Sequence, residues 1–161
     1  MSNYAKIKTF DIANGKGIRT SIFFSGCEFY CKECFNSELW NFNYGYPFTK
    51  GVYEKKIYPT ITNHIAGLSI LGGEPLHSYN LEAVSQLCTW FKTDFPHKNI
   101  WLWTGYTIEV LIEKAKTNEY MNNILNKVNT IVDGKFDVSQ KDLSLPFRGS
   151  KNQRVISNIH D

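Results

Sequence analysis

The 161-residue sequence lacks long apolar runs and carries little net charge, and both absences limit what the protein can be. No stretch approaches the roughly 20 apolar residues of a membrane-spanning helix. The N-terminal residues show no apolar h-region, so we expect no signal peptide. The formal net charge is only +3, and Lys55-Lys56 is the only adjacent basic pair. We therefore expect a cytoplasmic protein with neither a membrane nor a nucleic acid as partner.

Histidine is scarce, and its four positions show no spacing typical of a metal site. We expect all of them to be loop or surface residues rather than catalytic bases: His64, His77, His97 and His160. The sequence also lacks an internal repeat, a low-complexity tract and a linker. Residues 1–161 are therefore predicted to form a single domain, long enough to bury a hydrophobic core without disulfide bonds.

Cysteine is also infrequent, yet three of its four positions lie within eight consecutive residues. Cys27, Cys31 and Cys34 form the pattern Cys-x3-Cys-x2-Cys. Thiolates are soft metal ligands, and clustered thiols in a reducing compartment indicate a metal or catalysis. Since cubane iron–sulfur clusters usually have four cysteine ligands, three would leave one iron open. Cys88 falls on an apolar helical stripe, and we expect it in the core.

Two other uses of the three cysteines stay open at this point. Together with a distant histidine they could hold structural zinc, which prefers a closed site of four ligands. A disulfide is the second alternative. The spacing favours an iron–sulfur cluster over zinc, and a disulfide is the least expected of the three.

The rest of the sequence alternates between β-rich runs and segments of helical periodicity. The runs are rich in β-branched and aromatic residues and lead into glycine, which predicts strands over 20–25, 65–71, 99–104 and 128–133. Apolar spacing, caps and a stop at Pro59 predict helices over 49–58, 81–91, 107–115 and 119–126, with a last strand at 155–156. Such alternation predicts an α/β fold with mainly parallel strands.

Parallel strands place their carboxyl ends at one edge of a sheet, where ligands gather. Four segments follow predicted strands and should therefore lie at that edge: the cysteine loop, Gly72-Gly73-Glu74-Pro75, Trp103-Thr104-Gly105 and Asp133-Gly134-Lys135. They would converge on one site if the sheet curved. The chain is too short for eight βα units, so we expect an open partial (βα) barrel.

The cysteine motif after one strand and Gly-Gly-Glu-Pro after the next together resemble the radical S-adenosylmethionine superfamily. This resemblance implies a partial barrel of the radical S-adenosylmethionine type, in which Cys27, Cys31 and Cys34 hold a 4Fe-4S cluster. It also implies S-adenosyl-L-methionine on the open iron, cleaved to methionine and a 5′-deoxyadenosyl radical by one electron from the reduced cluster. Because the cofactors carry this chemistry, no catalytic side chain is expected.

A narrower resemblance covers nearly the whole chain and points to the family that activates anaerobic ribonucleoside-triphosphate reductase. It implies a glycyl-radical-enzyme activating enzyme, an oxidoreductase that acts on the large subunit of that reductase and receives its electron from a flavodoxin-type donor. The segments that carry it, besides Leu71 to Leu76, are Phe10-Asp11-Ile12, Gly15-x-Gly17-x-Arg19, Cys34-Phe35-Asn36, Trp103 to Tyr106, Asp133 to Phe136 and Gly149-Ser150-x-Asn152-Gln153-Arg154.

The resemblance assigns cofactor contacts to residues near the strand ends. They are Glu33, Cys34, Phe35, Gly72, Gly73, Glu74, Thr104, Asp133 and Lys135. Many superfamily members have an aromatic residue directly before the third cysteine, where it packs on the adenine. That position is Glu33 here, so Phe35 is expected to substitute. The two glycines would let the backbone approach the methionine end of the cofactor, with Glu74 near its positive charge.

Three arginines are candidate contacts to the partner or to the cofactor carboxylate: Arg19, Arg148 and Arg154. Two alternative functions are also retained. One is another short radical S-adenosylmethionine enzyme, which activates a different glycyl-radical enzyme or acts on a small molecule. Segment 149–154 favours the reductase activase over it. The other is a non-enzymatic metal-binding adaptor, which leaves the turn at 72–75 unexplained.

Overall fold

The computed structural model describes residues 1–35 and 37–157, so Asn36 and His160 lie outside the described residues. Within these ranges seven strands form one sheet in the order β3-β1-β2-β4-β5-β6-β7. Their bounds are β1 Asn3–Asp11, β2 Arg19–Phe24, β3 Tyr46–Pro47, β4 Gly67–Gly72, β5 Asn99–Trp103, β6 Thr130–Asp133 and β7 Arg154–Ser157.

The middle of the sheet is parallel and its edges are antiparallel. Strands β2, β4, β5 and β6 pair in parallel, whereas β1 and β7 run antiparallel to their inner neighbours and β3 runs antiparallel to β1. The prediction of an α/β fold with an open, mainly parallel sheet is confirmed for the four central strands. Its curvature toward a partial barrel stays a prediction.

Helices connect the parallel strands as predicted. Helix α2 (Leu81–Asp94) lies between β4 and β5 in the chain, and α3 (Ile108–Ala115) and α4 (Glu119–Lys127) lie between β5 and β6. No helix in the described ranges combines the length and the apolar composition needed to cross a membrane.

The helix predicted over 49–58 is irregular. It starts as α1 (Lys50–Val52), continues as a π-helical turn at Tyr53–Ile57 and ends in a 3-10 turn at Tyr58–Thr60. Pro59 lies in that last turn, where its missing N–H stops further helix formation. Two more 3-10 turns lie at Ser37–Trp40 and Val138–Gln140.

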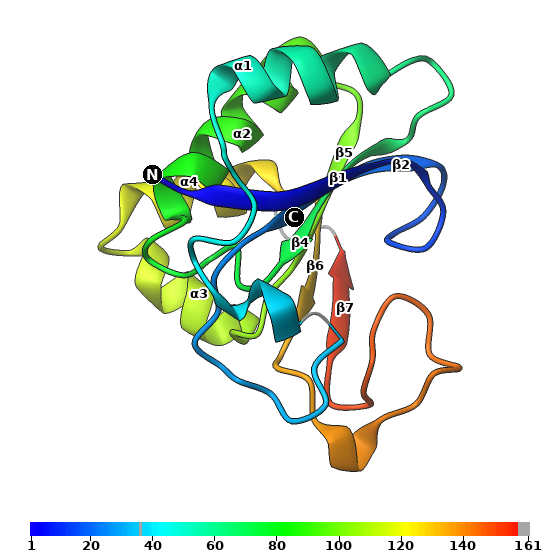
Figure 1. The fold of residues 1–161 in the computed structure, drawn as a ribbon, viewed down its shortest axis with the longest axis vertical. Helices are drawn as coiled ribbons and strands as arrows, with labels where there is room; N and C mark the ends of the chain where they lie inside the picture. The colour runs from blue at the N-terminus through cyan, green and yellow to red at the C-terminus, as the bar shows by residue number, and fades with distance from the viewer. Residues whose placement is uncertain (36, 158–161) are drawn as a thin grey trace.

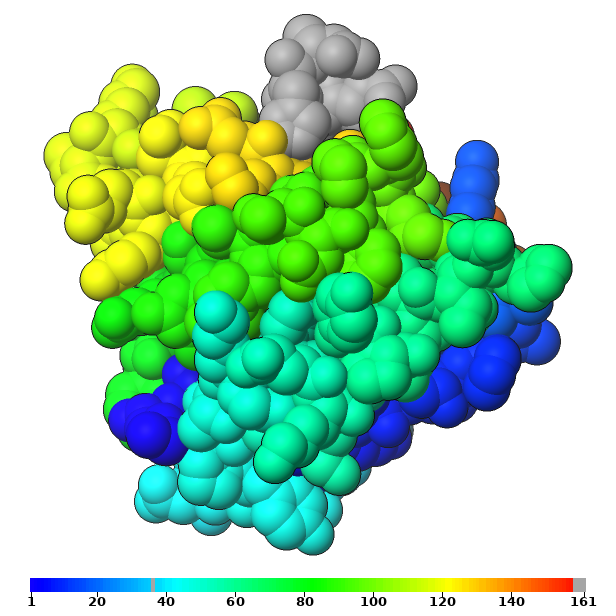
Figure 2. All heavy atoms as spheres, turned by 90° about the horizontal axis from the view of Figure 1, so that it is seen from above, coloured from blue at the N-terminus to red at the C-terminus, as the bar shows by residue number. Residues whose placement is uncertain are grey.

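The helices cover one face of the sheet (Figure 1), and Figure 2 shows the side on which the chain from α1 to α4, cyan to yellow, hides the strands. Because alternate strand residues point to opposite faces, Ile22, Ile70 and Leu102 belong to this side and are fully buried. Cys88 of α2 is buried in the same core, as predicted.

The opposite face of the sheet carries a second, smaller apolar group. Phe23, Leu71 and Leu39 are buried there, with Trp103 packed against them. The segment between β6 and β7, orange in Figure 1, is hydrogen-bonded to this face. The indole Nε1 of Trp103 donates to the carbonyl oxygen of Phe147 at 2.7 Å. This face forms the floor of the candidate site.

Candidate iron–sulfur site

The cysteine loop leaves the carboxyl end of β2, where the sequence predicts it. Cys27 is buried, whereas Cys31 and Cys34 are partly exposed, and all three are free thiols. Tyr30 and Glu33 between them have φ of 49° and 57°, a left-handed conformation that is uncommon for residues with a Cβ. The chain therefore turns sharply between successive cysteines.

Burial raises the pKa of two of these thiols. It is the largest cause for both, and it brings the pKa of Cys27 to about 11. Cys34 adds to the upward shift at Cys31, while a hydrogen bond from the Phe136 N–H and the charge of Lys135 oppose it. Because the thiolate is the form that binds metals, a positively charged centre would have to offset this cost.

The three cysteines border a common space. No three His, Cys, Asp or Glu side chains in residues 1–35 and 37–157 are placed to hold a metal ion. Zinc would need such convergence, because its four ligands surround one ion. In a cubane cluster each cysteine binds a different iron, so its three thiols need not converge on one point.

That space is one end of a cavity of about 530 Å³, a volume typical of ligand sites. Cys27, Cys31 and Cys34 line it together with residues at the ends of three further parallel strands. The other strand-end residues in the lining are Gly72, Gly73 and Glu74 after β4, Thr104 and Gly105 after β5, and Gly134, Lys135 and Phe136 after β6. The predicted meeting of four strand ends is therefore confirmed.

Gly72 and Gly73 bring the end of β4 against the start of the cysteine loop. The N–H of Gly73 donates to the carbonyl of Phe24 at 3.1 Å, and that of Glu74 donates to Gly26 at 2.7 Å. A Cβ on Gly73 would lie 2.5 Å from the Gly26 carbonyl oxygen, and Gly72 has φ of 143°. Glycine is therefore required here partly because this turn lies very close to another part of the protein's own backbone.

Glu74 is buried and uses both carboxylate oxygens within the protein. Oε1 accepts from the Gly105 N–H at 2.6 Å, and Oε2 accepts from the Thr104 hydroxyl at 2.8 Å and the Leu76 N–H at 2.9 Å. Burial raises its pKa to about 7, although these hydrogen bonds act in the opposite direction. Glu74 thus ties the end of β4 to the end of β5, a role that the sequence prediction did not include.

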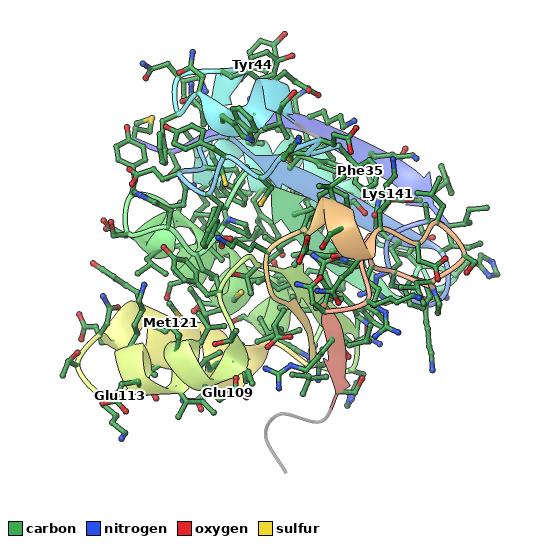
Figure 3. All side chains as sticks on the ribbon, turned by 90° about the horizontal axis from the view of Figure 1, so that it is seen from below. Phe35, Tyr44, Glu109, Glu113, Met121 and Lys141 are labelled. Atoms are coloured by element: carbon green, nitrogen blue, oxygen red, sulfur yellow. The ribbon has the colours of Figure 1, made fainter. Side chains whose placement is uncertain are left out.

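Phe35 and Lys135 line the cavity, whereas Glu33 is exposed and lies outside the lining. The ring of Phe35 packs on that of Phe136 with centroids 5.0 Å apart, and the Lys141 ammonium lies 5.6 Å from its centroid (Figure 3). The position of Phe35 suits the predicted substitution for an aromatic residue before the third cysteine.

Asp133 and Arg154 lie together outside this lining. Asp133 is buried, and it accepts from Arg154 Nε at 3.0 Å and from the Ile108 N–H at 2.8 Å. Arg154 also pairs with Glu109 at 2.7 Å. Asp133 therefore caps α3, in place of the predicted cap Thr107, whose side chain makes no capping bond. Both predicted site residues have partners within the protein.

Arg148 and Arg19 have contrasting surroundings. Arg148 lines the cavity, and its buried Nε has no hydrogen-bond partner among the described residues. Arg19 is fully buried and donates to Ser69 Oγ at 2.7 Å and to the Leu68 carbonyl at 2.9 Å. The structure corrects the prediction for Arg19: its guanidinium satisfies groups of β4 and does not face a partner or the cavity.

Residues 149–154 hold the segment after β6 in place. Gln153 Oε1 accepts from the Gly149 N–H at 2.8 Å, and its Nε2 donates to the Gly134 carbonyl at 2.9 Å. Asn152 donates to the Lys135 carbonyl at 2.9 Å. This motif therefore positions Lys135 and the following Phe136 beside Cys31.

Among the cavity residues that the sequence reasoning missed are two lysines of β1. Lys6 and Lys8 of β1 contribute to the lining, but no motif marks them, because their place follows only from the pairing of β1 with β2.

Of the described histidines, His77 lies near the cysteine loop, with Nε2 3.0 Å from the carboxylate of Glu28.

Comparison with known proteins agrees with this geometry. Residues 13–156 match the family described as a 4Fe-4S single cluster domain. The "Anaerobic ribonucleoside-triphosphate reductase-activating protein" of Vibrio cholerae serotype O1 is 40% identical over 95% of this chain and 96% of its own length. Proteins of the same name from Escherichia coli K12 and Enterobacteria phage T4 are 38% and 37% identical over 95% and 97% of this chain, and over 97% and 94% of their own lengths. The chain therefore belongs to the family of anaerobic ribonucleoside-triphosphate reductase-activating proteins.

Proposed function

We propose that this protein generates a glycyl radical on the large subunit of an anaerobic ribonucleoside-triphosphate reductase. The observation that carries the proposal is the meeting of three free cysteines and the Gly72–Glu74 turn at one cavity. It is supported by relatives of nearly equal length that are named as activating proteins of that reductase.

The residues around the cavity fit a 4Fe-4S cluster and S-adenosyl-L-methionine. Three thiols border the cavity, and the remaining cysteine, Cys88, is buried in the core on α2. One iron would therefore lack a cysteine ligand and could take the methionine group. If bound, the two cofactors would supply the chemistry: an electron from the reduced cluster would release methionine and a 5′-deoxyadenosyl radical, which would take a hydrogen atom from glycine.

The protein's own part is to hold and orient the cofactors and to keep water away. Gly72 and Gly73 present backbone to the cavity, and Phe35 offers a ring for the adenine. Arg148 is proposed to bind the carboxylate of the cofactor through its unpaired Nε–H. A flavodoxin-type protein is the proposed electron donor. Cys31 and Cys34 are partly exposed, so a cluster held by them would be accessible to it.

Anaerobic reconstitution tests this proposal. Wild type, Cys31→Ala and Cys88→Ala are loaded with iron and sulfide, reduced and given S-adenosylmethionine, with and without the reductase large chain. We expect 5′-deoxyadenosine from wild type and from Cys88→Ala, because Cys88 lies in the core, and none from Cys31→Ala. A loaded, reduced wild-type cluster that yields no 5′-deoxyadenosine even with the reductase would contradict the proposal and favour a metal-binding adaptor.

A further inference from the structure

The cavity extends beyond the cysteines along the face of the sheet that the helices do not cover. Its lining includes Lys6 and Lys8 of β1 and Asn14 of the β1–β2 turn. Lys8 is opposite Ser21, three residues before Phe24 at the end of β2. At about 3.4 Å per residue, Lys8 lies roughly 10 Å from that strand end, whereas Lys6, opposite Phe23, is only one residue from it. The cavity therefore extends from Lys6, near the edge at which the cofactors are proposed to bind, to Lys8, which is separate from that edge.

The charge along the cavity is mainly positive. Its basic residues are Lys6, Lys8, Lys135 and Arg148, and its one carboxylate, Glu74, is buried with both oxygens engaged. The Lys6 ammonium lies 4.6 Å from the centroid of the Phe23 ring on the cavity floor. Lysines at the edge of a sheet can also serve to prevent unwanted strand pairing. That role would not require the Lys6 ammonium to contact the floor of the cavity.

Lys8 is not fully neutralised by its nearest acid. Its ammonium lies 3.7 Å from the Asp11 carboxylate. That carboxylate is buried and already accepts hydrogen bonds from the Ser21 hydroxyl at 2.7 Å, the Asn14 amide at 2.6 Å and the Ala13 N–H at 2.9 Å. About half of the Lys8 side chain is exposed, so it stays available to a second acidic group.

Part of the lining is apolar and open to solvent. Leu143 contributes to the cavity although 76% of its surface is exposed. Phe147, on the same segment, is held by the hydrogen bond from Trp103 and packs on the Trp101 ring with centroids 5.1 Å apart. Basic and apolar surfaces side by side suit a peptide that carries both acidic and apolar residues.

We propose, on the basis of the proposed function, that Lys6 and Lys8 bind acidic side chains of the reductase segment that carries the target glycine. The glycine lies near the cysteines, and the segment extends along the floor of the cavity toward β1. At about 3.3 Å per residue of extended chain, an acidic residue roughly three or four positions from the glycine reaches Lys8.

A double variant tests this assignment. Lys6→Gln/Lys8→Gln is compared with Lys55→Gln/Lys56→Gln, which removes two exposed lysines outside the cavity. Three quantities are measured: the affinity for the reductase large chain at several salt concentrations, the reductase concentration that gives half-maximal glycyl radical, and the KM for S-adenosylmethionine. Urea denaturation midpoints serve as the check that all variants are folded.

We expect the first variant to bind the reductase roughly tenfold more weakly, with a smaller salt dependence and an unchanged KM for S-adenosylmethionine. The control should match wild type. Lysines at the acidic positions of the reductase segment should restore binding to Lys6→Glu/Lys8→Glu. Unchanged affinity for the reductase, or a raised KM for S-adenosylmethionine, would overturn the assignment. Absence of 5′-deoxyadenosine from wild type would instead reject the proposed function.

Discussion

A single missing side chain at position 73 sets the distance between two parts of the site. The backbone of Gly73 lies so close to Gly26 and Leu39 that a Cβ would be 2.5 Å and 2.9 Å from their carbonyl oxygens. Both oxygens belong to backbone, which cannot rotate away as a flexible side chain can. The Gly-Gly-Glu-Pro turn therefore positions the cysteine loop as well as lining the cavity.

Gly73→Ala should consequently destabilise the protein and displace the cysteine loop. We expect a loss of about 1–3 kcal/mol in the free energy of unfolding, as for other overpacked sites, and a lower iron content after reconstitution. Urea denaturation and iron analysis measure the two effects. Gly51→Ala is the control, since its Cβ would have Thr49 Oγ1 at 3.6 Å as nearest atom and alanine favours a helix. Equal effects of both substitutions would argue against a specific contact at Gly73.

At this scale the sequence predicts which residues gather but not how they are bonded. The cysteine pattern and Gly72–Pro75 are contiguous motifs and can be read directly. The hydrogen bond from Thr104 to Glu74 joins residues 30 positions apart. It depends on the register of β4 against β5, which no local pattern specifies. The burial of Arg19 was missed for the same reason, because its acceptors lie on a neighbouring strand.

Among the elements, α3 depends on side chains from two strands. Its first N–H is capped by Asp133 of β6, and Arg154 of β7 bridges Asp133 to Glu109 in the first turn of the helix. The Arg154 guanidinium lowers the pKa of Glu109 to about 2 from the ordinary 4.5. Because the folded-state pKa is depressed, the pair stabilises the protein above pH 4.5, and that stabilisation is lost as the pH falls toward 2.

Glu109→Gln should therefore lower the urea midpoint at pH 7, and the difference from wild type should shrink between about pH 4.5 and pH 2. Glu113→Gln is a matched control on the same helix as Glu109 (Figure 3). Among the described residues, Glu113 pairs only with the exposed Lys116. We expect little effect from it at any pH. A difference between Glu109→Gln and wild type that stays constant over this range would exclude the ion pair as its cause.

The elements themselves follow from the sequence where periodicity is strong. The helices predicted over 81–91, 107–115 and 119–126 correspond to α2, α3 and α4. Strand β1, by contrast, spans nine residues without such periodicity. Lys6 and Lys8 interrupt its apolar pattern on the cavity side, so its length appears only when β2 is paired with it.

For the molecule as a whole, the two faces of the sheet have separate tasks. The helices and the large core lie on one face and carry most of the buried apolar residues. The other face has a small apolar group and the cavity, which is lined by the three cysteines and by Lys6 and Lys8 of β1. The alternation of strands and helices along the sequence predicts the first face. The second depends on the antiparallel strands β1 and β7 and on the loop before β7, which alternation does not describe.

The most direct test of the central claim is electron paramagnetic resonance of the reductase large chain. It is incubated anaerobically with this protein, S-adenosylmethionine and a reductant, once with ordinary glycine and once with α-deuterated glycine incorporated. We predict a glycine-centred radical whose hydrogen splitting collapses on deuteration, together with 5′-deoxyadenosine, and neither product with Cys31→Ala. Formation of 5′-deoxyadenosine without a glycine-centred signal would contradict the assignment of this reductase as the substrate.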